Sequence, residues 1–255
     1  MDIKDVVALV TGGASGLGET CILELVKKGA RAVIVDFDSE KGEKLAANIG
    51  ANAIFVKTDV TSETDVRQAV QKSVEAFGKI NVLVNCAGVV NPGKIIGRKG
   101  PMPLEAFNKV LQINLVGAFN VIRLAVEQMM SNTPGEDGEK GVIINSASIA
   151  AFEGQIGQAA YSASKAGIVG MTLPIAREIS DYGIRIVTIA PGIFETPMMA
   201  GLPPAVKEDM AKTVPFPKRL GKPLEFAKMV LHIIDNIMLN GCCIRLDGAL
   251  RMPQK

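Results

Sequence analysis

Residues 6–18 read Val-Val-Ala-Leu-Val-Thr-Gly-Gly-Ala-Ser-Gly-Leu-Gly, an apolar run followed directly by a glycine-rich turn. The run predicts a buried strand, and a helical pattern follows the turn. Glycines let a pyrophosphate approach bare backbone, and a helix N-terminus directs free N–H groups and a positive dipole end at it. The spacing is G-x-x-x-G-x-G, and no Gly-Lys-Ser/Thr follows, which excludes a P-loop. The stretch favours a dinucleotide-binding turn, although such a turn alone could serve only for packing.

Apolar runs alternate with amphipathic stretches along the whole chain, a pattern typical of βαβ units and a mainly parallel sheet. Continuous Val, Ile and Leu runs indicate strands that are covered on both faces. Two helices are expected at residues 19–28 and 62–77, ended by Gly29 and Gly78. We therefore expect a single α/β domain over residues 1–255. The strands are expected at residues 6–11, 32–36, 53–57, 80–85, 141–146, 184–190 and 242–246.

Composition narrows the function classes. The net charge of +2 gives no support for binding to nucleic acid or to an anionic membrane. The 4 cysteines form no C-x-x-C pair, which favours a reducing compartment without structural zinc, and we expect no metal site. The only histidine, His232, lies in an apolar helical pattern and is expected to be structural. No apolar run approaches the ~18 residues of a membrane span, and the first residues lack a targeting pattern, so we expect a cytoplasmic protein.

Two segments interrupt the βα alternation, at about residues 91–103 and 197–223. Both are rich in Gly, Pro and basic residues and both follow expected strands. In a doubly wound sheet they would overhang the carboxyl ends of the strands, where ligands bind. We therefore expect them to be substrate loops.

Asp36 strengthens the dinucleotide interpretation. It ends the second expected strand, where an acidic side chain accepts hydrogen bonds from the adenosine ribose. Its charge would repel the 2′-phosphate of NADP, and the nearby positions Ala14 and Phe37 supply no cation to offset it. The predicted cofactor is therefore NAD. Asp59-Val60 and Asn85-Cys86-Ala87-Gly88 mark further turns at the same sheet edge.

Tyr161 and Lys165 lie four residues apart on an expected helix, and hence on one face. A nearby ammonium favours the phenolate, which at ~4 Å could lower the tyrosine pKa by up to about 3 units. Tyr161 would then be suited to exchange a proton with an alcohol. Ser148, just past a strand, could hydrogen-bond the same oxygen. The alternative is that Tyr161 and Lys165 are merely a pair on the surface of a helix. Tyr161 is, however, one of only 2 tyrosines in the chain, and it follows a pattern typical of a dinucleotide fold.

Taken together, these motifs resemble the short-chain dehydrogenase/reductase family over essentially the whole chain. The resemblance implies a Rossmann-like doubly wound sheet of seven parallel strands with helices on both faces. It also implies that Tyr161 is the acid/base, Ser148 polarises the substrate oxygen, Lys165 holds the nicotinamide ribose and Asn114 positions a relay water. Cys86 departs from the family, since many members carry a second Asn there; a backbone contact to the cofactor is expected instead. The matching positions are Thr11 to Gly18, Asp59-Val60, Asn85 to Gly88, Asn114, Ser148, Tyr161, Lys165 and Pro191-Gly192.

Within that family the chain closely resembles the type II 3-hydroxyacyl-CoA dehydrogenases, also called 17β-hydroxysteroid dehydrogenases type 10. Stretches 151–161 and 170–177 carry this likeness, which places Gln158 with Ser148 and Tyr161 on the substrate side. It implies a homotetramer, and the animal members are mitochondrial. The implied cofactor-binding residues are Gly12, Ser15, Gly16, Leu17, Gly18, Asp36, Asp59, Val60, Asn85, Cys86, Ala87, Gly88, Tyr161, Lys165, Pro191, Phe194 and Thr196.

The resulting prediction is reversible NAD-dependent oxidation of (S)-3-hydroxyacyl-CoA to 3-oxoacyl-CoA. The cations Lys94, Arg98 and Lys99 in the first substrate loop are predicted to attract the phosphates of coenzyme A. A hydroxysteroid or other secondary-alcohol dehydrogenase is the enzymatic alternative. An alternative of another class is a scaffold subunit of a larger complex, as animal relatives are in tRNA processing; the weak net charge does not favour it.

Overall fold

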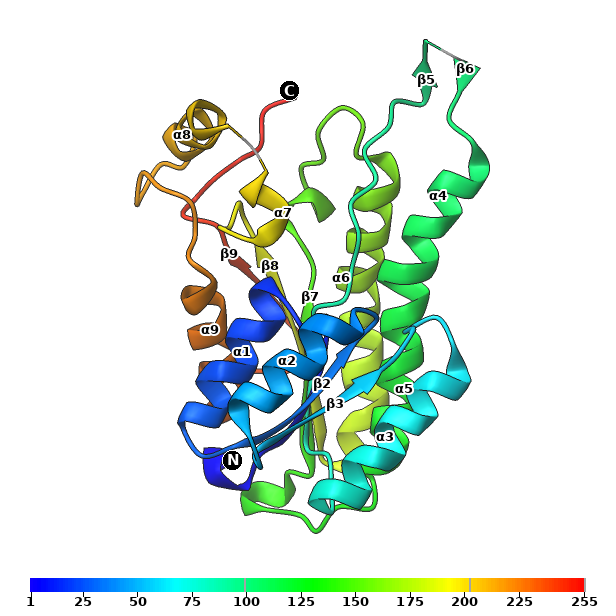
Figure 1. Cartoon of the computed structure of the whole chain (residues 1–255), viewed down its shortest axis with the longest axis vertical. Coiled ribbons are helices and arrows are strands. Elements are labelled where there is room, and N and C mark those ends of the chain that lie inside the picture. Colours follow the sequence, from blue (N-terminus) through cyan, green and yellow to red (C-terminus); the bar gives the residue numbers. More distant parts are fainter. Residues whose placement is uncertain (99, 202, 255) are drawn as a thin grey trace.

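The computed structural model describes residues 1–98, 100–201 and 203–254. Over these residues, seven parallel strands form one sheet in the order β3-β2-β1-β4-β7-β8-β9, with helices on both faces (Figure 1). The order reverses between β1 and β4, which places the ligand crevice of a doubly wound sheet at their carboxyl ends. The expected fold class is confirmed. The strands are β1 (Val7–Thr11), β2 (Arg31–Asp36), β3 (Ala53–Lys57), β4 (Val82–Asn85), β7 (Gly141–Ser146), β8 (Ile184–Pro191) and β9 (Cys243–Leu246).

The two faces of the sheet are covered by different helices. One face packs on α1 (Gly16–Lys27), α2 (Ser39–Ile49) and α9 (Pro223–Asp235) through residues such as Ile22 and Phe226, which are fully buried. The other face packs on α3 (Glu63–Phe77), α5 (Gly117–Met129) and α6 (Ala159–Ile179) through residues such as Leu83 and Met129. Burial on both faces explains why the strand sequences are apolar without alternation.

The helix boundaries follow local chemistry. The Ser62 hydroxyl accepts from the Asp65 N–H at the start of α3, and Gly78 ends that helix in the left-handed conformation, as expected. Helix α1 begins at Gly16, three residues earlier than the expected Glu19. The fourth strand begins at Val82, and the residue before it, Asn81, anchors the chain there: its side-chain amide accepts from the Val7 N–H and donates to the Asp5 carbonyl.

A long helical segment, Leu104–Met129, consists of α4 (Leu104–Leu111), a π-helical turn (Gln112–Val116) and α5. By length and composition alone it could cross a membrane, although no single apolar run in the sequence predicts one. Half of the most apolar 18-residue stretch of this segment is buried inside the domain. The segment packs there on α3 and α6. Packing in the core therefore accounts for its apolar character.

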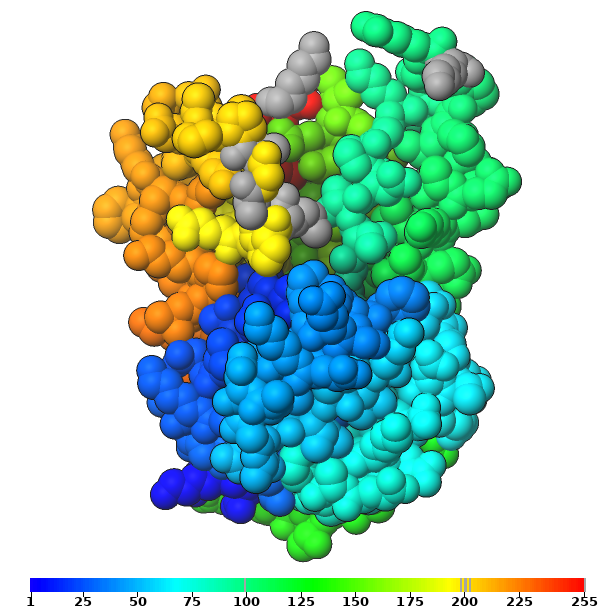
Figure 2. All heavy atoms as spheres, viewed as in Figure 1, coloured from blue at the N-terminus to red at the C-terminus, as the bar shows by residue number. Residues whose placement is uncertain are grey.

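The two expected substrate loops lie at the carboxyl edge of the sheet and are partly ordered into secondary structure. The first contains a short antiparallel pair, β5 (Ile96–Gly97) and β6 (Gly100–Pro101), which the sequence did not predict. The second contains α7 (Pro197–Ala200) and α8 (Pro204–Lys212). The two segments stand on opposite sides of the upper end of the molecule (Figure 2). Lys99 lies outside the described residues.

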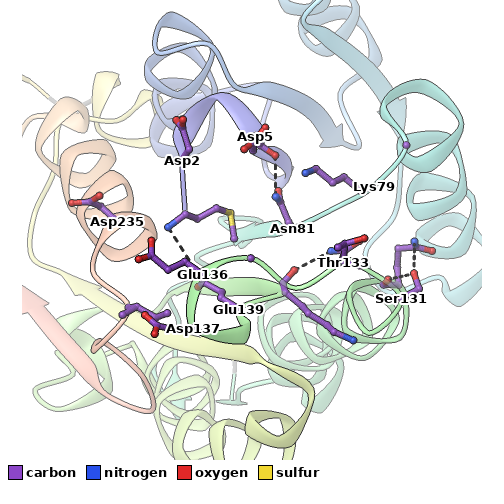
Figure 3. Close-up of a pocket in the computed structure, with 17 residues that line it drawn as sticks. Asp2, Asp5, Lys79, Asn81, Ser131, Thr133, Glu136, Asp137, Glu139 and Asp235 are labelled. Carbon is purple, nitrogen blue, oxygen red and sulfur yellow. Dashed lines mark hydrogen bonds and ion pairs between the residues drawn. The ribbon is translucent and has the colours of Figure 1, made fainter.

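A cavity of about 570 Å³ lies at the opposite edge, lined by acidic side chains that include Asp2, Glu136 and Asp235 (Figure 3). Glu139 there pairs with the Met1 amine (3.7 Å) and with Arg185 (2.7 Å). The Arg185 guanidinium also donates to carbonyls at the end of α9 and beyond it. This cavity contains none of the expected catalytic residues, and ligands of parallel sheets bind at the other edge.

Candidate active site

The carboxyl edge of the sheet brings Tyr161 and Ser148 together. Tyr161 lies in the first turn of α6, and Ser148 follows β7 and caps a short 3₁₀ turn by accepting from the Ala150 N–H (3.1 Å). Burial raises the pKa of Tyr161 above 10.0, while a hydrogen bond with the Ser148 hydroxyl acts in the opposite direction. The hydroxyl of Tyr161 therefore retains its proton at neutral pH in this structure.

Lys165 lies one turn further along α6, as the four-residue spacing requires. Its Nζ donates to the Ser146 carbonyl (2.8 Å) and lies 5.8 Å from the centroid of the Tyr161 ring. The side chain is buried, and burial lowers its pKa from 10.5 to about 8, against a smaller upward effect of the Cys86 thiol. The expectation that Lys165 lowers the pKa of Tyr161 is wrong for this structure. The ammonium is near the ring rather than specifically paired with the hydroxyl, and desolvation of the phenol dominates.

Asn114 lies in the π-helical turn and connects the cofactor side to the catalytic helix. Its Oδ1 accepts from the Val89 N–H (2.8 Å), and its Nδ2 donates to the Val89 carbonyl (2.9 Å) and to the Ser164 hydroxyl (3.1 Å). A Cβ added at Gly88 would lie 3.3 Å from Asn114 Oδ1 and 3.6 Å from Lys165 Nζ. The side chain thus fixes the segment after β4 against α6. The relay-water role remains a prediction.

The glycine-rich turn has the shape that a dinucleotide needs. Gly12 has φ +62°, and a Cβ there would lie 2.8 Å from the backbone of Cys86 and Ala87. A Cβ at Gly18 would collide with the Gly12 carbonyl, so this helix start can approach the turn only as glycine. Ser15 precedes α1 without making a side-chain cap bond. The first N–H groups of the helix are therefore available to a phosphate, with Leu17 in that first turn.

Asp36 lies at the end of β2 beside this turn. Its Oδ2 accepts from the Ala14 N–H (3.0 Å) and its Oδ1 from the Asp38 N–H (3.0 Å). A carboxylate has about four acceptor positions, so both oxygens can still accept from ribose hydroxyls. The carboxylate therefore also holds the glycine-rich turn, a role that sequence reasoning missed.

The expected cofactor residues Asp59, Val60 and Cys86 also lie at the carboxyl edge of the sheet. The Asn120 amide fixes the Val60 carbonyl (2.9 Å), and Asp59 Oδ1 accepts from the Thr61 N–H (2.9 Å). Cys86 is partly buried against the core, where its thiol hydrogen-bonds Cys21 and, with burial, raises the pKa of Cys21. This placement agrees with a cofactor contact through the Cys86 backbone.

A row of buried polar side chains supports the loop after β4. Asn85 Nδ2 donates to Asn145 Oδ1 (3.0 Å), and Thr11 Oγ1 donates to Asn85 Oδ1 (3.3 Å) and accepts from the Ala87 N–H (3.2 Å). Sequence reasoning missed Asn145. A polar residue inside an apolar strand was the available signal.

After β8, which ends at Pro191, the chain returns toward the glycine-rich turn. Phe194 is buried and bridges to Gly221, and Thr196 precedes α7. A Cβ at Gly16 would lie 3.3 Å from Pro197, so this segment lies directly over the cofactor turn. The position of Phe194 and Thr196 fits the predicted cofactor contacts.

On the expected substrate side, Gln158 precedes α6 and its Oε1 accepts from the Gln155 N–H (3.0 Å). Gln158 and Ser162 line a groove of about 560 Å³ whose other wall includes Gly93 and Ile95 of the first substrate loop. His232 is exposed on α9, outside this arrangement, as expected.

The comparisons with known proteins agree with this geometry. The 3-hydroxyacyl-CoA dehydrogenase type-2 of Drosophila melanogaster is 54% identical over 252 residues, covering 98% of this chain and 99% of the relative. The crystal structure of 3-hydroxyacyl-CoA dehydrogenase type-2 from Mycobacterium avium superposes with a TM-score of 0.95 at 40% identity, covering 99% of this chain and 98% of that one. A 3-ketoacyl-(acyl-carrier-protein) reductase from Brucella melitensis complexed with NADH gives a TM-score of 0.87 at 30% identity, over 98% of this chain and 100% of that one.

The family model described as short chain dehydrogenase matches residues 6–207, from the first strand to α8. That span contains the glycine-rich turn, Asp36 and the group formed by Ser148, Tyr161 and Lys165. With geometry, sequence and structural neighbours in agreement, the chain belongs to the short-chain dehydrogenase family.

Proposed function

We propose that this protein catalyses the NAD-dependent oxidation of (S)-3-hydroxyacyl-CoA to 3-oxoacyl-CoA and the reverse reduction. The observation that carries the proposal is the half-buried Tyr161 with the buried Ser148 and Lys165, beside a dinucleotide cradle that ends in Asp36. The substrate class is supported by the Drosophila and human relatives, which are 54% and 53% identical and are both named 3-hydroxyacyl-CoA dehydrogenase type-2.

The residues of the chain supply proton transfer and positioning. Tyr161 exchanges the proton of the substrate oxygen, and the Ser148 hydroxyl holds that oxygen beside it. Lys165, bound to the Ser146 carbonyl at the end of β7, would hold the nicotinamide ribose. When bound, NAD would supply the hydride chemistry at the reacting carbon. Burial raises the pKa of Tyr161, so its hydroxyl is protonated at neutral pH. The protonated hydroxyl can donate a proton during the reduction, whereas the oxidation needs a proton acceptor and is favoured by higher pH.

We propose that the acyl-CoA enters along the groove between Gln158 and the first substrate loop, whose lining residues Ala159 and Ser162 lie near Tyr161 in the first turn of α6. Lys94 and Arg98 are exposed in that loop, at and beyond the wall of the groove. We propose that these cations attract the phosphates of coenzyme A, as mobile charges at the entrance. Lys99, the third predicted cation, lies outside the described residues.

The test is turnover of a panel of (S)-3-hydroxyacyl-CoA esters and hydroxysteroids with NAD. The proposal expects higher kcat/KM for the CoA esters. Turnover of steroid alcohols alone would favour the secondary-alcohol alternative. Lack of turnover on every substrate, with intact NADH binding, would favour the scaffold alternative.

We also propose a homotetramer in the cytoplasm. The exposed apolar side chains Phe119 on α5 and Leu173 on α6 support association of helical faces. In the C-terminal segment, Leu250 packs on Ile149 and Val214 of its own chain, so this side chain is not available to such an interface. Light scattering at micromolar concentration tests the tetramer, and imaging of a tagged protein in its native cells tests the location.

A further inference from the structure

Lys57 is a cation beside the carboxylate that is expected to meet the adenosine ribose. It is the last residue of β3 and lies in register with Asp36, the last residue of β2. Side chains in register on neighbouring parallel strands point to the same face, about 4.8 Å apart at the backbone. Sequence reasoning considered only Ala14 and Phe37, which are close to Asp36 in the turn or along the chain, and so overlooked this cation.

Phe37 holds the Lys57 ammonium in place. Nζ lies 5.4 Å from the centroid of the Phe37 ring, within the range of a cation–π attraction. The ring is 69% exposed, so it is a surface support rather than part of the core. Because Phe37 directly follows Asp36, this contact keeps the cation close to the ribose end of the cradle.

The other cation in this region is already neutralised. Lys41, in the first turn of α2, pairs with Asp38 at 2.6 Å. By contrast, none of the ion pairs found over residues 1–98, 100–201 and 203–254 includes Lys57. Asp65, whose pKa Lys57 helps to lower, is committed to the Asp59 N–H and the Ser62 hydroxyl. Lys57 therefore keeps a charge that a ligand phosphate could use.

We propose that Lys57 is a second determinant of coenzyme specificity, a counter-charge that partly offsets the repulsion between Asp36 and the 2′-phosphate of NADP. This inference rests on the proposed dinucleotide-dependent function. It implies that discrimination against NADP depends on one carboxylate opposed by one lysine. NADPH should then bind more weakly than NADH but measurably, and loss of the Asp36 charge should reverse the preference rather than only weaken NADH binding.

The experiment measures dissociation constants of NADH and NADPH by fluorescence titration, without substrate. Lys57→Met should raise the Kd of NADPH roughly 3- to 10-fold, the size of an exposed ion pair with a phosphate. The Kd of NADH should change less than about 2-fold. Lys57→Arg should retain the wild-type ratio, and Lys72→Met, which removes an exposed lysine from α3, is the matched control. The effect of Lys57→Met on NADPH should shrink at high salt because exposed charges are screened.

Asp36→Asn provides the second arm. This variant should bind NADPH more tightly than NADH, and adding Lys57→Met should remove that gain. Equal changes for NADH and NADPH in Lys57→Met would show a merely structural role, and no change for either would show that Lys57 does not meet the phosphate; both outcomes overturn the inference. Absence of 3-hydroxyacyl-CoA turnover in a wild-type protein that binds NADH would refute the proposed substrate and leave this inference standing.

Discussion

Replacing Lys165 by methionine should stabilise the cofactor-free protein at neutral pH while abolishing turnover. Lys165 is 5% exposed, and its burial lowers its pKa from 10.5 to about 8. At about 1.36 kcal/mol per pKa unit, this difference corresponds to about 3 kcal/mol of instability carried by the buried ammonium. Losing the hydrogen bond to the Ser146 carbonyl costs about 1 kcal/mol. The free energy of unfolding should therefore rise by about 2 kcal/mol at pH 7, since methionine fills a similar space.

The dependence on pH follows from the same shift. Between the folded pKa of about 8 and the usual 10.5, the unfolded state binds more protons than the folded state. The cost of burying the Lys165 ammonium is full below pH 8 and is lost toward pH 10.5. The free energy of unfolding of the wild type should therefore rise with pH through this range. The advantage of Lys165→Met should shrink over the same range.

Urea unfolding followed by circular dichroism, at fixed protein concentration and at several pH values between 7 and 10, measures both effects. Lys72→Met, which alters an exposed lysine, is the control and should change stability by less than about 0.5 kcal/mol. A Lys165→Met protein that is less stable than wild type at pH 7, or a difference that does not narrow with pH, would refute this reasoning.

Three other predictions follow from the site and the core. Tyr161→Phe should lower kcat by at least ~10²-fold because the proton carrier is lost. The Kd of NADH, measured by fluorescence, should stay near the wild-type value. A near-normal kcat would contradict the proposed role of Tyr161. Neutralising Lys94, Arg98 and Lys99 together should raise KM for acetoacetyl-CoA roughly 10-fold with little change in kcat, and equal effects on acetoacetyl-N-acetylcysteamine would show that the loop does not read coenzyme A. Arg185→Met should lower the free energy of unfolding by about 3 kcal/mol, since it leaves the buried carboxylate of Glu139 with only the more distant Met1 amine at 3.7 Å; denaturation with an unchanged midpoint would contradict this.

The positions of the strands could be predicted from the sequence to within one or two residues. The β1 run ends at Thr11 and the β7 run spans Gly141–Ser146, as the apolar pattern indicated. These signals are local, because a strand covered on both faces must be apolar throughout. The hairpin at Ile96–Pro101 escaped prediction because two-residue strands with Gly and Pro carry no periodicity.

The candidate site was predictable as a set of residues but not as an electrostatic environment. Spacing alone placed Tyr161 and Lys165 on one helix face. The direction of the Tyr161 pKa was wrong because burial depends on what surrounds the phenol, and those surroundings come from distant parts of the chain.

The sequence by itself determined the fold class, the glycine-rich turn and the choice of candidate catalytic side chains, because each depends on residue types within a few positions of one another. Only the tertiary structure decided which charges meet. Lys57 lies beside Asp36 through strand pairing, and Lys165 reaches the Ser146 carbonyl from another element. Electrostatic interactions act through space and fall with distance and solvent exposure, so their balance is set by packing between elements rather than by order along the chain.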